Sequence, residues 1–192
     1  MDEDFLKHVY NHSLLSTEDL MKIGGAHEEV SYKKGEFVLK VGQLANDYLI
    51  LKSGLMRSFV YDYNTNDITT DFFIDNELVI EVSSLFQRIP TRESIQTLTE
   101  CVCLKISFEN FQNLFHSIEG LREWGRGWLS DSLFEFKQRS ISMLTDSATE
   151  RYLSLTKTKP LVAQQAPLKH IASYLGITDS SLSRIRKETA KH

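Results

Sequence analysis

Residues 166–188 read APLKHIASYLGITDSSLSRIRKE and predict two short helices joined by a sharp turn. Leu168, Ile171 and Leu175 recur at helical spacing, so the first helix has one apolar face. Gly176 follows where the chain must turn, and glycine tolerates the positive φ that such a turn requires. The segment is therefore expected to fold as a helix-turn-helix.

The second helix of this segment is expected to begin just after Thr178. The threonine hydroxyl can accept a hydrogen bond from a backbone N–H two or three residues later, which makes it a good N-cap. Leu182 and Ile185 form the buried face. The opposite face carries short hydroxyls followed by long cations, at Ser180, Ser181, Arg184 and Lys187. Such a face is typical of a helix that meets base edges and phosphates in DNA.

The charge of the chain is divided unevenly. Its 192 residues carry a net charge of −4, which argues against a protein that coats nucleic acid without sequence preference. Residues 145–192 hold eight Lys or Arg and four Asp or Glu, which gives +4 and leaves −8 for residues 1–144. This asymmetry favours an acidic sensor or scaffold with a basic DNA-binding end over the alternative, an ordinary pair of amphipathic helices.

Several other classes of protein are not expected. No run approaches the roughly eighteen apolar residues of a membrane span, and the N-terminus lacks the basic start of a signal peptide, so we expect a cytoplasmic protein without a membrane partner. Cys101 and Cys103 are expected to be reduced residues of a strand. Because we find no metal-ligand spacing, nucleophile–base motif or phosphate-binding glycine loop, we expect neither an enzyme nor a bound metal.

Short strands are expected through the middle of the chain. Residues 5–23 are predicted to be helical, with a capping box at residues 16–19. The strand signals then occupy residues 30–32, 37–39, 48–51, 56–61, 68–74 and 95–106. Turn residues such as Gly35, Gly42 and Gly54 separate them. Many short strands at this spacing predict an antiparallel barrel or sandwich.

Helices are expected to follow the strands. A helix opens after Ser107, a long one covers residues 118–144, and another begins at residues 146–150 and ends at Pro160. Apolar residues of the long helix alternate between spacings of three and four, which suits packing against another helix. The predicted homodimer interface consists of Trp124, Trp128, Leu129, Leu133 and Phe136. The alternative is a helix packed only on its own barrel.

This order of strands, long helix and helix-turn-helix resembles the CRP/FNR superfamily of bacterial transcription regulators. The likeness lies in residues 34–42 (KGEFVLKVG), 48–54 (YLILKSG) and 98–107 (LTECVCLKIS), and in the C-terminal segment. It implies an α+β fold with an N-terminal antiparallel β-roll of the cyclic-nucleotide-binding type, a jelly roll. A long dimerisation helix and a C-terminal helix-turn-helix follow. The chain closes at His192, so it resembles the short, Bacteroidetes-like form that lacks a full wing.

The resemblance also implies that the chain is divided into three parts with different roles. Residues 1–117 are expected to form the sensor domain, residues 118–144 the dimerisation helix and residues 145–192 the DNA-binding domain. The implied function is that of a homodimeric, sequence-specific transcription regulator, with double-stranded DNA and RNA polymerase as partners. The alternative from another class is a sensory module that binds a ligand or a protein and does not bind DNA.

The helix-turn-helix is expected to supply the DNA contacts. The candidate residues are Lys169, Thr178, Asp179, Ser180, Ser181, Arg184, Arg186 and Lys187, with Lys191 as a further phosphate contact. Arg184 aligns with the base-contacting arginine of the superfamily and is expected to contact a guanine, with a phosphate contact as the alternative. Asp179 suits a helix N-terminus but repels phosphate, unless it accepts a hydrogen bond from a cytosine amino group.

An effector site is a further implication of the resemblance. The candidate residues are Glu77, Thr91, Arg92 and Ser94. Members that bind cyclic AMP use a Gly-Glu pair for the ribose and an Arg-Ser type pair for the cyclic phosphate. Here Asn76 stands in place of the glycine, Thr91 stands at the arginine position, and Glu93 opposes an anion beside Arg92. Cyclic AMP, another small effector and no effector therefore all stay open, and no cofactor is assigned. The alternative role of Glu77 and Arg92 is a solvated loop pair.

Overall fold

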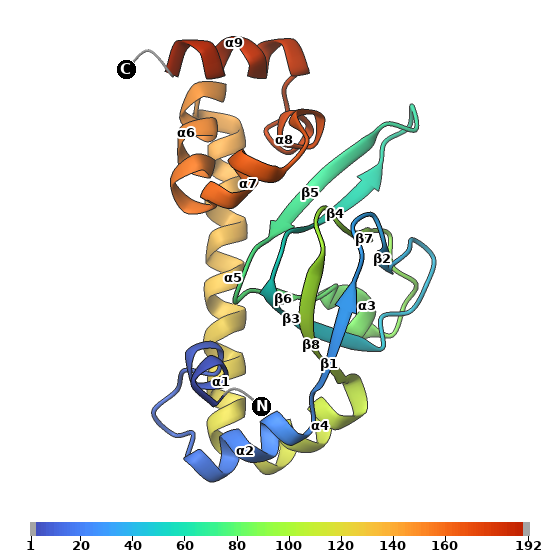
Figure 1. Ribbon diagram of the computed structural model, residues 1–192, viewed down its shortest axis with the longest axis vertical. Helices are drawn as coiled ribbons and strands as arrows, with labels where there is room; N and C mark the ends of the chain where they lie inside the picture. The colour runs from blue at the N-terminus through green and yellow to red at the C-terminus, as the bar shows by residue number, and fades with distance from the viewer. Residues whose placement is uncertain (1–2, 190–192) are drawn as a thin grey trace.

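The computed structural model describes residues 3–189 of the chain. In chain order its elements are α1 (Glu3–Val9), α2 (Thr17–Gly25), β1 (Glu28–Tyr32), β2 (Phe37–Leu39), β3 (Asp47–Ser53), β4 (Met56–Tyr61), β5 (Asp67–Phe73), β6 (Leu78–Val79), α3 (Val82–Gln87), β7 (Ser94–Thr97), β8 (Cys101–Ser107), α4 (Phe108–Ser117), α5 (Glu119–Thr145), α6 (Ala148–Thr158), α7 (Pro160–Gln165), α8 (Leu168–Tyr174) and α9 (Asp179–Thr189). The strands lie on one side of the long helix α5, and the C-terminal helices gather at one of its ends (Figure 1).

Two antiparallel sheets make up the strand-rich part, which we call the β-roll. Their strand orders within the described residues are β1-β8-β3-β6 and β2-β7-β4-β5. Leu49, Leu51 and Cys103 from the first sheet share one core with Met56 and Ile95 from the second. Both cysteines are free and buried. The expected jelly-roll-like arrangement of short antiparallel strands is therefore confirmed.

The helical segment predicted over residues 5–23 is two helices rather than one. α1 ends at Val9 and α2 begins after Ser16. The Ser16 hydroxyl accepts a hydrogen bond from the backbone N–H of Asp19, and the Asp19 carboxylate accepts one from the backbone N–H of Ser16. This capping box satisfies the N–H groups that are free only at a helix start. The capping box is thus confirmed, and it marks the beginning of a separate helix.

The long helix α5 is part of the core at one end and exposed at the other. Leu121 and Trp124, near its N-terminus, are buried in the β-roll core. Farther along, Leu133 and Phe136 are exposed. α5 runs from the end of the molecule that holds α4 to the end that holds α6 (Figure 1). None of the helices in residues 3–189 combines the length and the apolar character needed to cross a membrane.

The helices that follow α5 pack on the β-roll through a second apolar cluster. Leu55 and Phe72 of the β-roll are buried there together with Ile171 of α8 and Leu182 of α9. Pro160 ends the preceding helix as expected, but it also stands in the first turn of α7, where its missing N–H is tolerated. The outcome is a group of helices held against the β4–β5 side of the β-roll.

Candidate nucleic-acid interface and effector cavity

The turn between α8 and α9 has the geometry that the sequence predicts. Gly176 has a φ of +68°, in the left-handed region that glycine adopts without strain. The Thr178 hydroxyl accepts a hydrogen bond from the backbone N–H of Ser181 at 3.2 Å and so caps α9. Leu182 and Ile185 are buried. The positive φ and the cap are therefore confirmed, and the buried pair fixes which face of α9 points outward.

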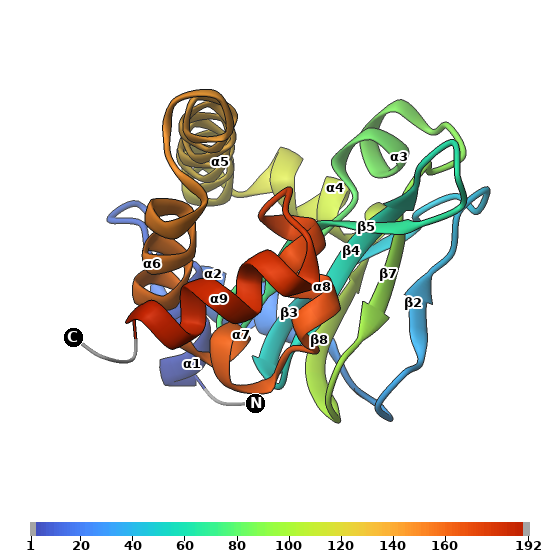
Figure 2. The same cartoon turned by 90° about the horizontal axis from the view of Figure 1, so that it is seen from above.

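The outer face of α9 is polar and largely basic. Asp179, Ser180, Arg184 and Lys187 are exposed on it. Within residues 3–189, neither Arg184 nor Lys187 forms an ion pair. Figure 2 shows α9 at the near end of the molecule, with no other element drawn across it. Cations without an internal partner on an uncovered face are available to an external anion.

The other predicted DNA contacts have mixed positions. Lys169 is exposed on α8, whereas Ser181 and Arg186 are half-buried. The Thr178 hydroxyl donates to the Ser181 hydroxyl at 3.0 Å in addition to its capping bond, so both groups are engaged within the chain. Lys191 lies outside the described residues. The structure therefore brings Lys169 and the outer face of α9 to the surface and leaves Thr178 with a structural role.

Most of the predicted dimer residues form an apolar stripe on α5. Leu129, Leu133 and Phe136 are 52%, 67% and 68% exposed. Trp128 is half-buried and packs against the β-roll core. Large apolar side chains that stand together on one helix are normally covered by a partner surface. We refer to Leu129, Leu133 and Phe136 below as the α5 stripe.

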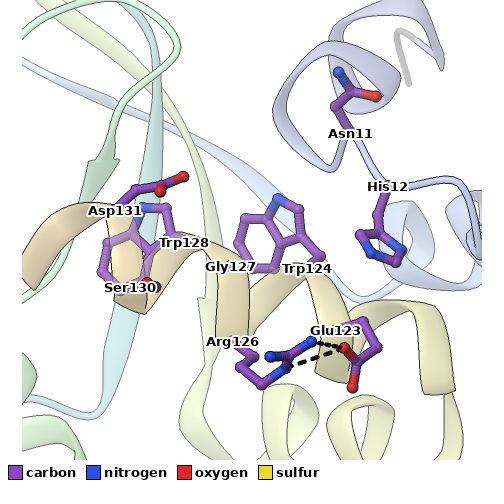
Figure 3. A pocket seen from close by; sticks show the side chains of 9 residues that line it. All are labelled: Asn11, His12, Glu123, Trp124, Arg126, Gly127, Trp128, Ser130 and Asp131. Atoms are coloured by element: carbon purple, nitrogen blue, oxygen red, sulfur yellow. Dashed lines mark hydrogen bonds and ion pairs between the residues drawn. The ribbon is translucent and has the colours of Figure 1, made fainter. Parts of the chain in front are cut away.

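Trp124 belongs to the core of its own chain rather than to the α5 stripe. Its indole N–H donates to the backbone carbonyl of Val9 at 2.9 Å, and its ring packs against Tyr10. It also borders a surface pocket of about 430 Å³ where the segment after α1 meets α5 (Figure 3). Arg126 and Glu123 both line this pocket and form an ion pair with an N–O distance of 2.5 Å, so their charges compensate each other. Trp124, which was predicted to lie at the dimer interface, is therefore engaged in contacts within its own chain.

The four predicted effector residues are not gathered around one cavity. Glu77 is half-buried and pairs with Lys159 of the C-terminal helices at 2.8 Å. Burial raises the pKa of Glu77, in opposition to the nearby lysine. Thr91 and Ser94 are buried, and their hydroxyls are bonded to backbone groups of the chain. Arg92 is exposed. None of the four lines the cavity inside the β-roll.

That cavity has a volume of about 720 Å³, which is within the range of small-molecule sites. Its lining consists of Tyr32, Val38, Leu39, Gly42, Gln43, Leu44, Ala45, Asn46, Asp47, Leu49, Val79, Glu81, Pro90, Ile95 and Lys105. The lining mixes aliphatic side chains with polar groups, among them two carboxylates and one ammonium group, and more of its surface is polar than apolar. This cavity is therefore more polar than the usual ligand site, which is an apolar wall with a few polar groups.

The charged groups of this cavity do not fit the anionic phosphate of a cyclic nucleotide. The Glu81 carboxylate accepts a hydrogen bond from the backbone N–H of Ser84 at 2.6 Å, so an internal anion already caps α3. Lys105 is paired with Glu28 at 2.7 Å. The Arg88 guanidinium donates to a backbone carbonyl and an asparagine side chain near the cavity. The cavity therefore favours a neutral or cationic occupant over an anionic one.

Glu81 is the acidic residue that sequence reasoning missed. It lines the cavity, whereas the predicted Glu77 lies outside it. A local signal existed, because an acidic residue three positions before Ser84 can act as a helix N-cap. The sequence in this region does not show where such a short helix begins. The N-cap pattern alone therefore could not show that Glu81, rather than Glu77, lines the cavity.

Comparison with known proteins agrees with the architecture. Residues 29–117 match the family described as the cyclic nucleotide-binding domain, and this range extends from β1 through α4. No curated protein sequence is significantly similar to this chain. The β-roll is therefore similar to domains of the cyclic-nucleotide-binding type, although its cavity residues do not suit the ligand that gives that family its name.

Three solved structures share the fold over nearly the whole chain. The c-di-GMP-responsive global regulator CLP of Xanthomonas campestris is 19% identical, with 92% of each chain covered and a TM-score of 0.70. FixK2 of Bradyrhizobium japonicum is 14% identical, with 86% of this chain and 85% of that chain covered and a TM-score of 0.73. A protein of Eubacterium rectale, classed with the crp/fnr family of transcriptional regulators, is 15% identical, with 92% and 85% covered and a TM-score of 0.70. At these identities the likeness concerns the fold.

Proposed function

We propose that this chain is a homodimeric, sequence-specific DNA-binding transcription regulator of the CRP/FNR type. The observation that carries the proposal is the uncovered outer face of α9, where Arg184 and Lys187 have no ion-pair partner in residues 3–189. A capped turn holds this helix against α8, as in a helix-turn-helix whose second helix enters the major groove. The shared fold with transcription regulators supports the same function.

In this proposal the α5 stripe forms the dimer interface. Burial of a leucine or phenylalanine side chain contributes about 1.5–3 kcal/mol, so two copies of Leu129, Leu133 and Phe136 supply a substantial driving force. Two α5 helices packed around a two-fold axis would present two copies of α9. A spacing of about 34 Å between them lets both meet successive major grooves on one face of a near-palindromic site.

The residues of α9 would divide into base and phosphate contacts. Arg184 would donate two hydrogen bonds to a guanine, since a guanidinium matches its O6 and N7 acceptors. Lys187 and Lys169 would meet phosphates, which positions the protein without selecting a sequence. A regulator bound in this way would act on transcription through RNA polymerase at the promoter.

Control by a small molecule would operate through the β-roll cavity. An effector bound there would shift the equilibrium between two orientations of the DNA-binding helices. The size of the shift is limited by the difference between its affinities for the two orientations. The lining residues favour a neutral or cationic effector, because Glu81 and Asp47 are acidic and Lys105 is already paired with Glu28. No step of the proposed DNA recognition depends on a cyclic nucleotide.

Selection from a pool of random duplexes by the purified, ligand-free protein tests this function. We expect enrichment of a two-fold symmetric site, with an affinity that falls steeply as salt is raised because bound cations release counterions from DNA. The absence of any salt-dependent affinity for duplex DNA would instead favour the alternative, a sensory module that binds a ligand or a protein.

A further inference from the structure

A buried arginine joins the β-roll to the C-terminal helices. Arg57 lies in β4 and is 2% exposed. One of its terminal nitrogens, Nη1, donates to Nδ1 of His170 on α8 at 2.7 Å and to Thr69 Oγ1 at 3.1 Å. The guanidinium also donates to both carboxylate oxygens of Asp67, at 3.1 and 2.9 Å. Because a guanidinium has no acceptor, Nδ1 of His170 must be the acceptor in this contact.

The same strands hold the C-terminal helices at further points. The backbone N–H of Thr69 donates to the Ser173 hydroxyl on α8 at 3.2 Å. Arg139 of α5 donates to the backbone carbonyl of Thr70, and its guanidinium lies 3.9 Å from the centre of the Tyr174 ring. α8 and β5 are side by side in both Figure 1 and Figure 2. The β4–β5 hairpin is therefore the part of the β-roll to which α8 is attached.

The chemistry of this attachment restricts α8 to one position. A guanidinium removed from water must keep its acceptors, and its planar fork matches a carboxylate in one orientation. His170 supplies one of those acceptors from α8, only six residues before Gly176 and the turn into α9. A shift of α8 would separate His170 from Arg57 and take from the buried Nδ1 of His170 its donor, while Nη1 of Arg57 would keep Asp67 and Thr69 as acceptors. The contact is thus directional, unlike the apolar contacts around it.

We propose that Arg57 is a positioning residue for DNA recognition, which fixes the orientation of α8 and, through the α8–α9 turn, of the outer face of α9. The proposal rests on the proposed DNA-binding function. In the attached arrangement the outer face of α9 is uncovered (Figure 2), so this arrangement is the one that binds DNA. In a dimer, the fixed orientation also sets the distance between the two copies of α9.

The test compares two variants that each remove one paired cation from the β-roll. Arg57→Met keeps the apolar stem and removes the guanidinium. Lys52→Met is the matched control, because Lys52 lies in β3 of the other sheet and pairs with Glu29 at 2.6 Å. Size and thermal unfolding are measured first, so that only folded dimers of unchanged mass are compared. If Arg57→Met does not fold, Asp67→Asn takes its place, since Asp67 is only half-buried.

The first measurement is amide hydrogen exchange in the free protein. Release of α8 should raise exchange in α8 and in residues 67–70 of Arg57→Met, relative to wild type and to Lys52→Met. Unchanged exchange in these segments overturns the proposal. Because no DNA is present, this measurement decides whether Arg57 positions α8 even if the protein proves not to bind DNA.

The second measurement is affinity for the selected duplex and for duplexes with one base pair added or removed between the half-sites. Arg57→Met should lose at least about fivefold in its preference for the selected spacing, which is the lower end of typical coupling effects. A merely structural role would weaken all three duplexes equally and would overturn the proposal. A wild-type protein without affinity for duplex DNA would contradict the proposed function, and the exchange result would still stand.

Discussion

The Arg184 guanidinium lies on the exposed face of α9 and has no ion-pair partner in the described part of the chain. Arg184→Ala should cost roughly 1–3 kcal/mol on the preferred site and relax selectivity at one base position. Competition titrations against single-base variants of the site measure both effects. Lys187→Ala is the comparison, because loss of a phosphate contact should weaken all sequences alike. Equal losses on all sequences for Arg184→Ala would assign Arg184 to a phosphate.

The buried His170 makes stability depend on pH. Burial and the Arg57 cation lower the pKa of His170 from 6.5 to about 4, while Asp67 acts in the opposite direction and Lys169 adds to the lowering. Between these pKa values the unfolded chain binds a proton that the folded chain excludes. Stability should therefore fall as the pH decreases from about 6.5 to about 4, by at most about 1.4 kcal/mol per pH unit.

Urea unfolding of wild type and His170→Gln at pH 7 and pH 5 measures this dependence. The variant keeps a side-chain acceptor for Arg57 but lacks the titrating ring, so its loss of stability between the two pH values should be smaller. His27 is common to both proteins; burial also lowers its pKa, and its contribution cancels in the comparison. Identical losses in the two proteins would exclude His170 as the source.

Single residues differ in how far the sequence predicts their roles. The caps at Ser16 and Thr178 and the positive φ of Gly176 were predictable, because each depends on a few neighbouring residues. The contact between Arg57 and His170 was not, since the two residues are 113 positions apart. Only the fold brings them together, and an arginine in a strand that also carries Met56 and Phe59 was the available hint.

The α5 stripe allows a prediction at the scale of one element. Leu133→Glu combined with Phe136→Glu should convert the dimer into a monomer, because charged groups would replace apolar side chains at the interface. Loss of two such side chains from each copy should raise the dissociation constant of the dimer at least about 100-fold. Sedimentation equilibrium measures the mass.

Met21→Glu is the control for this prediction. Met21 is a comparably exposed apolar residue, 61% accessible, but it lies on α2 rather than on α5. It should leave the dimer intact. A dimer that survives the double substitution in α5 would show that the α5 stripe is not the interface and that the helix packs only on its own β-roll.

Elements with strong periodicity were predicted well. The expected helix over residues 118–144 corresponds to α5 at Glu119–Thr145. Its apolar spacing predicted an apolar face, but not whether that face would pack on the same chain or on a second copy. Trp124, which was expected at the dimer interface, lies in the core of its own chain. α3 and α7 have six residues each and were not predicted, because such short helices show no periodic pattern.

For the whole molecule, the β-roll cavity predicts that cyclic AMP is not a ligand. Cyclic AMP at about 1 mM should not shift the midpoint of thermal unfolding. A ligand that binds only the folded chain with a dissociation constant well below this concentration would raise the midpoint. The physical reason is that Glu81 occupies the N-terminus of α3 and Lys105 is already paired. Sodium phosphate at equal ionic strength is the control. A saturable stabilisation by cyclic AMP alone would contradict the reading of the cavity.

The relative placement of the parts was the least predictable feature at this scale. The order of the segments indicated a strand-rich domain, a long helix and a helix-turn-helix. The docking of α8 on β5 and the shared cluster of Leu55, Phe72 and Ile171 depend on contacts between distant segments. Those contacts decide which face of α9 is uncovered, and therefore how a dimer could present it to DNA.

Binding to a full symmetric site and to an isolated half-site, each measured over a range of salt concentrations, shows whether DNA is read by two paired copies of α9. Wild type should prefer the full site strongly and lose affinity as salt rises. Leu133→Glu with Phe136→Glu should remove the preference but keep salt-dependent binding to the half-site. Equal wild-type affinity for the full site and the half-site would contradict a dimer that reads two half-sites through paired copies of α9.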